Sequence, residues 1–141
     1  MAAPLSPEAK TFLKEVVYAH LATLMKDGSP QVTPVWVDTD GTNILINTAV
    51  GRVKMDNMER NARVALSIMG MENAYRCLFV RGRVKEIAPD EGNRHISSLS
   101  KRYTGNDRYQ GRPGETRMRV VIEPLHVTER LGPPPGAPPR R

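Results

Sequence analysis

The chain has 141 residues, enough for one domain that buries its own core. Its 21 Lys and Arg outnumber 15 Asp and Glu, for a formal net charge of +6 that falls mainly in residues 101–141. Aromatic residues are only 5% of the chain, too few for a base-stacking surface, and no apolar run approaches the roughly 18 residues of a membrane span. Cys77 is the single cysteine, which fits a reducing compartment. We therefore expect a soluble cytoplasmic protein that binds neither nucleic acid nor membrane.

The first part of the chain predicts a short helix followed by three strands. Ser6 and Pro7 suit the N-cap and the first position of a helix, and we expect Phe12, Val16 and Val17 on one of its faces. Apolar or alternating runs, separated by the Asp-Gly turns KDGS and DTDGT, then predict a meander. Its three strands are residues 20–25, 30–38 and 43–48.

The remainder predicts two further helices and three further strands. A short helix is expected directly after Gly51. The strands are residues 62–70, 75–88 and 116–130. Gly82 interrupts the second of these runs and indicates a β-bulge. Residues 89–105 break the alternation and predict a helix with Pro89 in its first turn and Gly105 at its end.

Six short strands of even spacing, with short helices between them, indicate a mainly β fold. So few residues do not cover two sheets, which favours a barrel over a sandwich. We expect this domain to occupy residues 1–131. The tail, residues 132–141, reads GPPPGAPPRR and holds too much proline to pack, so we expect it to be extended or disordered.

Several kinds of reactive site are not indicated by the sequence. The histidines His20, His95 and His126 are widely spaced and no C-x-x-C pattern is present, so no metal site is expected. The sequence holds no G-x-S-x-G, Walker A or G-x-G-x-x-G motif. Cys77 lies in a strand, where a cysteine usually packs as a small apolar residue. No catalytic residue is identified on these grounds.

The segment 47-NTAVGRVKMDN-57 has the chemistry of an anion site. A strand ends near Thr48 and a helix follows Gly51, so free backbone N–H groups and the helix dipole favour a negative charge there. Arg52 can hold a phosphate with two hydrogen bonds, and Lys54 adds a point charge. Basic residues next to a turn are also common on solvated surfaces, so the residues alone leave both readings open.

Pro34, in 32-VTPVWV-37, marks a break in the second strand. Proline cannot donate to a ladder, so the strand is an edge or is bulged at this point. Trp36, the only tryptophan, follows two residues later. A broad aromatic beside a broken ladder can face a flat ligand, and it can equally fill the end of a barrel.

Taken in order, these segments resemble a known family. They are HLATLMKDGSPQVTPVWVDTDGTNILINTAVGRVKMDNMERNARVALSI, then YRCLFVRGRVKEI, RYTG and a closing HVTERL. The set resembles the pyridoxamine 5'-phosphate oxidase-like split barrels, and more closely their subgroup that uses the deazaflavin coenzyme F420. The resemblance covers about residues 10–131. It implies a six-stranded split β-barrel that forms a homodimer, with two flavin or deazaflavin sites in the grooves between subunits.

The resemblance also implies which residues contact the cofactor. The strand that carries Gln31, Val32, Thr33, Pro34, Val35 and Trp36 would line the ring system. Asn47 and Thr48 would lie on the ribityl and phosphate side. The phosphate group itself would be held by the segment with Gly51, Arg52, Lys54 and Asn57. Tyr75 and Arg76 would reach the ring from the partner subunit.

The function implied by the resemblance is hydride transfer from reduced F420 to an electron-poor small molecule such as an enone, a quinone or a tetrapyrrole. An FMN-binding oxidoreductase of the same fold, and a non-catalytic carrier of F420, are the alternatives. The net positive charge favours F420, whose oligoglutamate tail is anionic. The acceptor pocket is expected in the loops 70–76 and 104–115.

Two features depart from the family pattern. Pyridoxamine phosphate oxidases proper end in an arginine-histidine substrate motif, whereas this chain ends in GPPPGAPPRR, so vitamin B6 oxidation is not expected. Asp56 occupies a position where relatives often have a basic residue. This predicts weaker binding of the anionic tail of F420.

Overall fold

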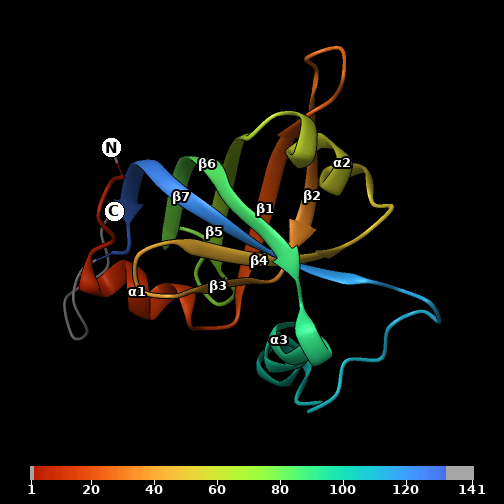
Figure 1. The fold of residues 1–141 in the computed structure, drawn as a ribbon. Coiled ribbons are helices and arrows are strands. Elements are labelled where there is room, and N and C mark those ends of the chain that lie inside the picture. The colour runs from red at the N-terminus through yellow and green to blue at the C-terminus, as the bar shows by residue number, and fades with distance from the viewer. Residues whose placement is uncertain (1, 133–141) are drawn as a thin grey trace.

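The computed structural model describes residues 2–132 as an antiparallel sheet with short helices around it (Figure 1). Most of the predicted disordered tail lies outside the described residues. The helices are α1 (Pro7–Leu13), α2 (Val53–Arg60) and α3 (Arg94–Thr104), with a 3-10 turn, η1 (Glu91–Asn93), before α3. The strands are β1 (Val17–Leu24), β2 (Pro30–Val35), β3 (Val37–Thr39), β4 (Ile44–Ala49), β5 (Arg63–Gly70), β6 (Cys77–Pro89) and β7 (Arg117–Arg130).

The sheet has seven strands, not the six that were predicted. Their order is β2-β1-β5-β6-β7-β4-β3. The predicted strand 30–38 is divided at Trp36, because β2 pairs with β1 whereas β3 pairs with β4 at the opposite edge. Since β2 and β3 are consecutive in the chain, the two edges of the sheet must come together at Trp36. The fold is therefore of the split-barrel type, as expected. Pro34 itself is paired with His20, and the strand that carries it is an edge strand, as predicted. The crossing between the two edges lies two residues later, at Trp36.

The core lies inside the curved sheet and is closed by α1. Phe12 and Leu13 of α1 are fully buried, together with Leu21, Ile44 and Ile68 from the strands. The predicted helix start is confirmed, since the Ser6 hydroxyl accepts from the Ala9 amide and Pro7 opens the helix. The helix ends at Leu13, however, and Val17 begins β1. The β-branched pair Val16 and Val17 fits a strand better than a helix, so their placement on the helix face was wrong.

Gly82 forms the predicted bulge in β6. The pairing of β6 with β7 shifts register between Arg81 and Gly82 and again after Val84. A Cβ atom on Gly82 would lie 2.6 Å from the carbonyl oxygen of Glu123, closer than atoms can approach. The missing side chain therefore lets the two strands pass at this bend.

The helix α3 begins later than predicted. Pro89 is the last residue of β6 and pairs with Met118, so it is not in a helical turn. The Asp90 carboxylate instead accepts hydrogen bonds from the backbone amides of His95 and Ile96, at 3.0 and 2.9 Å. These bonds supply partners for the amides at the start of α3. The predicted end is confirmed, since Gly105 has a φ of 83° at the C-cap.

The three helices lie around different parts of the sheet (Figure 1). α1 lies near the end of β7, α2 on the opposite side, and α3 beneath the strands. No helix among residues 2–132 has the length and apolar character needed to cross a membrane.

Candidate functional site

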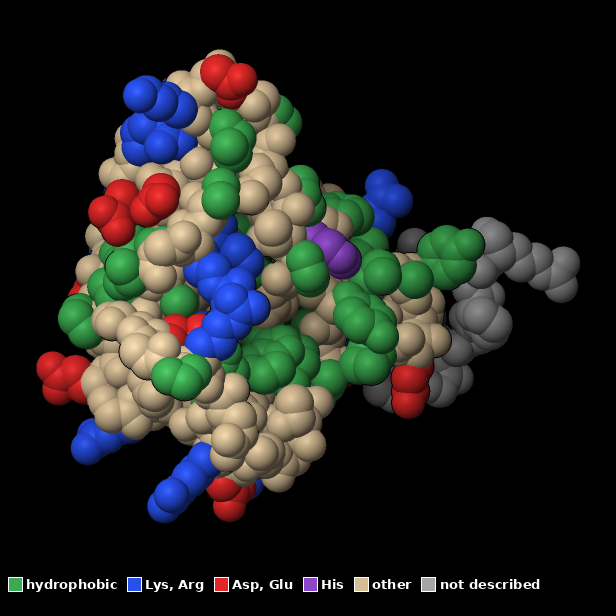
Figure 2. Space-filling view, turned by 90° about the vertical axis from the view of Figure 1, so that its right-hand side faces the viewer, with side chains coloured by type: hydrophobic (Ala, Val, Ile, Leu, Met, Phe, Trp, Pro, Cys, Tyr) green, Lys and Arg blue, Asp and Glu red, His purple; other side chains and the backbone are tan. Residues whose placement is uncertain are grey.

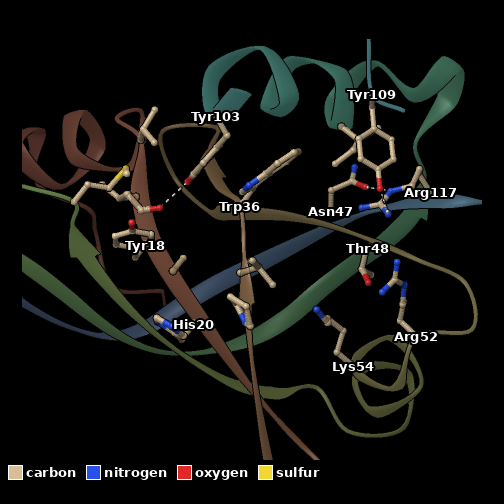
Figure 3. A pocket seen from close by; sticks show the side chains of 17 residues that line it. Tyr18, His20, Trp36, Asn47, Thr48, Arg52, Lys54, Tyr103, Tyr109 and Arg117 are labelled. Atoms are coloured by element: carbon tan, nitrogen blue, oxygen red, sulfur yellow. Dashed lines mark hydrogen bonds between the residues drawn. The ribbon is translucent and has the colours of Figure 1, made fainter. Parts of the chain in front are cut away.

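A cavity of about 610 Å³ opens where the two edges of the sheet meet. Its walls come from β1, the end of β2, β4, the start of α2, α3 and the loop before β7 (Figure 3). This volume lies within the usual range for sites that bind small molecules or cofactors. The walls divide into a cationic end and an aromatic end.

The cationic end holds Arg52, Lys54 and Arg117, which we call the cation cluster. Figure 3 shows these side chains on the same side of the pocket as Thr48. Arg52 is the N-cap of α2 and makes no side-chain cap bond, so the helix presents unpaired backbone donors there. The pKa of Lys54 lies below its usual value, first because of burial and then because of the charges of Arg52 and Arg117. Such mutual repulsion between cations is relieved when an anion binds.

Arg117 is held rigidly at this end by a chain of hydrogen bonds. Its Nε donates to Asn47 Oδ1 at 2.9 Å, and its guanidinium lies 4.9 Å from the centre of the Tyr109 ring. Asn47 Nδ2 in turn donates to Asp90 Oδ2 at 2.9 Å and lies 3.2 Å from His95 Nδ1. The side chain of Arg117 is only 8% exposed. Because this buried guanidinium is already fixed in place, its remaining donors can bind a ligand with little loss of side-chain entropy.

The aromatic end is built around Trp36. Its ring stacks on Tyr103 with centroids 5.3 Å apart and meets Tyr109 edge-on at 6.4 Å. The Tyr103 hydroxyl donates to the Val17 carbonyl at 3.1 Å and accepts from the Val37 amide at 3.3 Å. Burial raises the pKa of this hydroxyl, so Tyr103 stays neutral. Its hydrogen bonds tie α3 to β1 and to β3, and its ring supports Trp36.

Asp38, in β3, anchors α3 without lining the pocket itself. Its carboxylate lies 2.7 Å from Lys14 Nζ, 2.8 Å from Arg102 Nη2 and 3.4 Å from His95 Nε2. Burial alone would raise the pKa of Asp38, but its contacts with His95, Lys14 and Arg102 outweigh burial and hold the pKa well below the usual range. Asp38 therefore stays ionised, and it fixes the helix that carries Tyr103.

The structure brings seven of the predicted cofactor residues into one pocket. They are Pro34, Val35, Trp36, Asn47, Thr48, Arg52 and Lys54. Both loops expected to form the acceptor pocket also reach it, through Met71 and Tyr109. Asp56, which was expected to weaken the anion site, is exposed in the first turn of α2 and does not line the pocket.

Seven other predicted residues do not line this pocket in the single chain: Gln31, Val32, Thr33, Gly51, Asn57, Tyr75 and Arg76. Asn57 is buried, donates to Thr23 Oγ1 at 3.0 Å and accepts from Arg60 at 2.7 Å. Arg76 pairs with Glu15 through two contacts of 3.2 Å. Tyr75 is 90% exposed. The roles of these residues stay predictions.

Several lining residues were not singled out from the sequence, chiefly Tyr18, His20 and Arg117. Arg117 is 70 residues from Asn47 in the chain and reaches it because β4 pairs with β7. A prediction that these two strands pair would have placed it beside the pocket. Within the part of the chain that is described, no group of three His, Cys, Asp or Glu side chains is arranged to hold a metal ion.

Comparison with known proteins gives one family. The family described as pyridoxamine 5'-phosphate oxidase matches residues 5–130. A solved structure of an F420 reductase is 32% identical, with 84% of this chain and 94% of that chain covered and a TM-score of 0.75. No protein with a curated description matched the sequence.

Two more distant structures share the fold. The conserved hypothetical protein Rv2991 from Mycobacterium tuberculosis is 22% identical over 89% of this chain and 84% of that chain, with a TM-score of 0.67. HupZ from Group A Streptococcus is 19% identical over 89% of this chain and 94% of that chain, with a TM-score of 0.62. At these identities the likeness concerns the fold alone.

Proposed function

This chain belongs to the pyridoxamine 5'-phosphate oxidase family, and from that premise we propose that it is an oxidoreductase dependent on coenzyme F420. The acceptor would be an electron-poor small molecule of the enone, quinone or tetrapyrrole type. The observation that carries the proposal is the division of one pocket into a cation cluster and an aromatic end. This is the pattern that a phosphate-bearing ligand with a flat ring needs.

The residues present fit such a cofactor. Arg52, Lys54 and Arg117 suit the phosphate, because three cationic side chains line one end of the pocket. Burial first, and then the charges of Arg52 and Arg117, lower the pKa of Lys54, and a bound anion would offset that repulsion between cations. Pro34, Val35 and Trp36 offer a mostly apolar wall for the ring. Figure 2 shows basic side chains in a row across one face, with hydrophobic side chains beside them. Because the apolar wall suits the ring and the basic side chains suit the phosphate, the ligand would bind in one orientation.

F420 is proposed over FMN on two grounds. The F420 reductase noted above is 32% identical to this chain, and its match covers 94% of its own length. The chain is also basic, with a net charge of +6, which suits a cofactor with an anionic tail.

When bound, reduced F420 supplies the hydride. This chain would contribute the positions of the cofactor and the acceptor, and the positive charge that binds the phosphate. The ring wall and the cation cluster would hold the donor and the acceptor near contact distance, roughly 3–3.5 Å, which is the geometry that the transfer needs. Trp36 is braced by Tyr103 and Tyr109, so the wall is supported from behind before a ligand is present. The hydroxyl of Tyr103 is fully engaged with the backbone, which makes it a brace and not a proton donor.

The same proposal includes a homodimer in the cytoplasm with its sites shared between subunits. Two large hydrophobic side chains that line the pocket are exposed, Tyr18 at 48% and Met71 at 51%. Tyr75, at 90%, is the side chain expected to reach the partner's ring. A second subunit would cover these residues and remove them from water.

Titration with both cofactors tests the choice of F420. Trp36 is the only tryptophan and lines the pocket, so its fluorescence reports binding directly. We expect F420 to quench it at lower concentration than FMN does. Tight FMN binding with no binding of F420 would favour the FMN-dependent alternative.

A further inference from the structure

Glu115 brings a negative charge into the cation cluster. Its Oε1 lies 3.1 Å from Arg117 Nη1, and its Oε2 lies 3.7 Å from Arg52 Nη2. The carboxylate thus bridges two of the three cations. Its side chain is only 9% exposed, so the charge is weakly screened by solvent.

The position of Glu115 is fixed by its surroundings. The Glu115 amide donates to the Arg112 carbonyl at 3.1 Å, and the next carbonyl, of Thr116, accepts from the Val50 amide at 3.0 Å. Gly111 packs directly against the carboxylate, since a Cβ there would lie 2.8 Å from Glu115 Oε1. The loop before β7 therefore places this carboxylate against the cluster as a built feature and not as a free surface side chain.

The charges of the pocket can be added directly. Arg52, Lys54 and Arg117 line the pocket and carry three positive charges. Glu115 does not line the pocket itself, but it contacts two of these cations and brings one negative charge to them. A ligand phosphate is attracted by the cations and repelled by the carboxylate. Because Coulomb energy is proportional to the product of the charges, the repulsion energy for a doubly charged phosphate is twice that for a singly charged one. The factor by which Glu115 raises the dissociation constant of a doubly charged phosphate is therefore the square of the factor for a singly charged one.

We propose that Glu115 is a specificity-determining residue that favours a singly charged phosphate diester over a doubly charged terminal phosphate ester. This inference rests on the proposed function, since the phosphate of F420 is a diester through which the side chain continues, whereas FMN ends in a monoester. Glu115 then disfavours FMN at the phosphate, while the ring wall accepts either ring system.

Two flavins that share the ring system and differ in the charge of the phosphate provide the probe. FMN is a dianion at pH 8, because its second phosphate pKa is about 6. Riboflavin 4',5'-cyclic phosphate has the same ring and is a monoanion. Dissociation constants for both are measured by Trp36 fluorescence on the wild-type protein, on Glu115→Gln and on Glu123→Gln. Glu123 is the matched control, because it forms a comparable ion pair of 3.1 Å with Arg83 away from the pocket.

We expect Glu115→Gln to tighten the cyclic monoanion by about 5-fold and FMN by about 25-fold, which is the squared factor. Glu123→Gln should change neither. Glutamine keeps an acceptor for Arg117, and Asn47 still holds that side chain at 2.9 Å, so the cluster should keep its shape. Glu115→Ala is a second variant that removes the charge by another route, and circular dichroism melting establishes that each variant is folded.

An equal change for both probes, weaker binding of both, or no binding of either probe to any form would overturn the proposal. The readout needs no turnover and no F420. If reduced F420 is oxidised by the protein but the ratio of the two constants does not move, only the role of Glu115 fails. If the ratio moves but F420 does not bind, the proposed cofactor fails while the effect of Glu115 stands.

Discussion

At the residue scale, the cation cluster depends on two different kinds of support. Arg52 and Lys54 come from one short segment at the start of α2, and Arg52 is 47% exposed. Arg117 is buried and is oriented by Asn47, which Asp90 holds in turn. The more exposed Arg52 has room to adjust to a ligand, whereas the buried Arg117 sets where the anionic group lies. Direct and supporting residues can therefore be separated by substitution.

Replacing Arg52 or Lys54 by alanine should each weaken binding of the phosphate-bearing cofactor. The loss of one charged hydrogen bond corresponds to about 1–3 kcal/mol in the free energy of binding. Titration of Trp36 fluorescence measures it. Lys10→Ala, on the exposed side of α1 and outside the pocket, is the control that should bind as the wild type does. Unchanged affinity in both pocket variants would refute the phosphate site.

Cofactor affinity should also fall on the alkaline side. A protonated Lys54 attracts the anion and a neutral one does not, so affinity is full below the pKa of Lys54 and is lost as the pH rises through it. Because burial and the neighbouring arginines lower that pKa, the loss should begin at a lower pH than for an ordinary lysine. Lys54→Arg, which stays charged, should abolish this decline. An identical decline in that variant would assign it to another group.

At the element scale, the pocket exists because β2 and β3 part at Trp36. The chain leaves one edge of the sheet at Val35 and joins the other at Val37, and Tyr103 of α3 bonds across the gap. The bulges in β6 bend the opposite side of the sheet so that these edges can meet. The strand break at Trp36 and the bulges in β6 therefore both contribute to the curvature that closes the sheet.

Gly82→Ala should destabilise the fold without touching the pocket. The new Cβ would lie 2.6 Å from the Glu123 carbonyl, so β6 and β7 would have to separate. We expect a loss of about 1–3 kcal/mol in the free energy of unfolding, as for other overpacked sites. Urea denaturation measures it. Lys85→Ala, exposed on the same strand, should stay within about 0.5 kcal/mol of the wild type. Equal stability of the two variants would mean that the strands tolerate a side chain at the bend.

At the scale of the whole molecule, the sequence predicted the features that depend on neighbouring residues. It did not predict the contacts that depend on which strands pair. The strands, the start of α1, the bulge at Gly82 and the stop at Gly105 each follow from neighbouring residues. Arg52 and Lys54 were predicted as anion-binding residues because the end of a strand, a glycine and the two cations are adjacent in the sequence. Arg117 and Tyr109 reach the pocket only through the loop before β7 and the β4–β7 pairing, which no local pattern reports. The seventh strand was missed because alternation continues through the break at Trp36.

The shared-site proposal requires a dimer. Exposed Tyr18, Met71 and Tyr75 are expected to be covered by the second subunit. Light scattering should give about twice the chain mass of 15.7 kDa. Tyr75→Ala should bind cofactor more weakly with the dimer intact, because only the ring contact is lost. A monomeric mass would exclude a site shared between subunits.

Oxidation of reduced F420 tests the central claim most directly. The purified protein is given reduced F420 and a panel of enones and quinones, and the return of deazaflavin absorbance is followed over time. The account predicts turnover with at least one acceptor, and strong loss of that turnover when Arg52 and Lys54 are both replaced by alanine. Binding of F420 without turnover of any acceptor would contradict an oxidoreductase and identify a carrier.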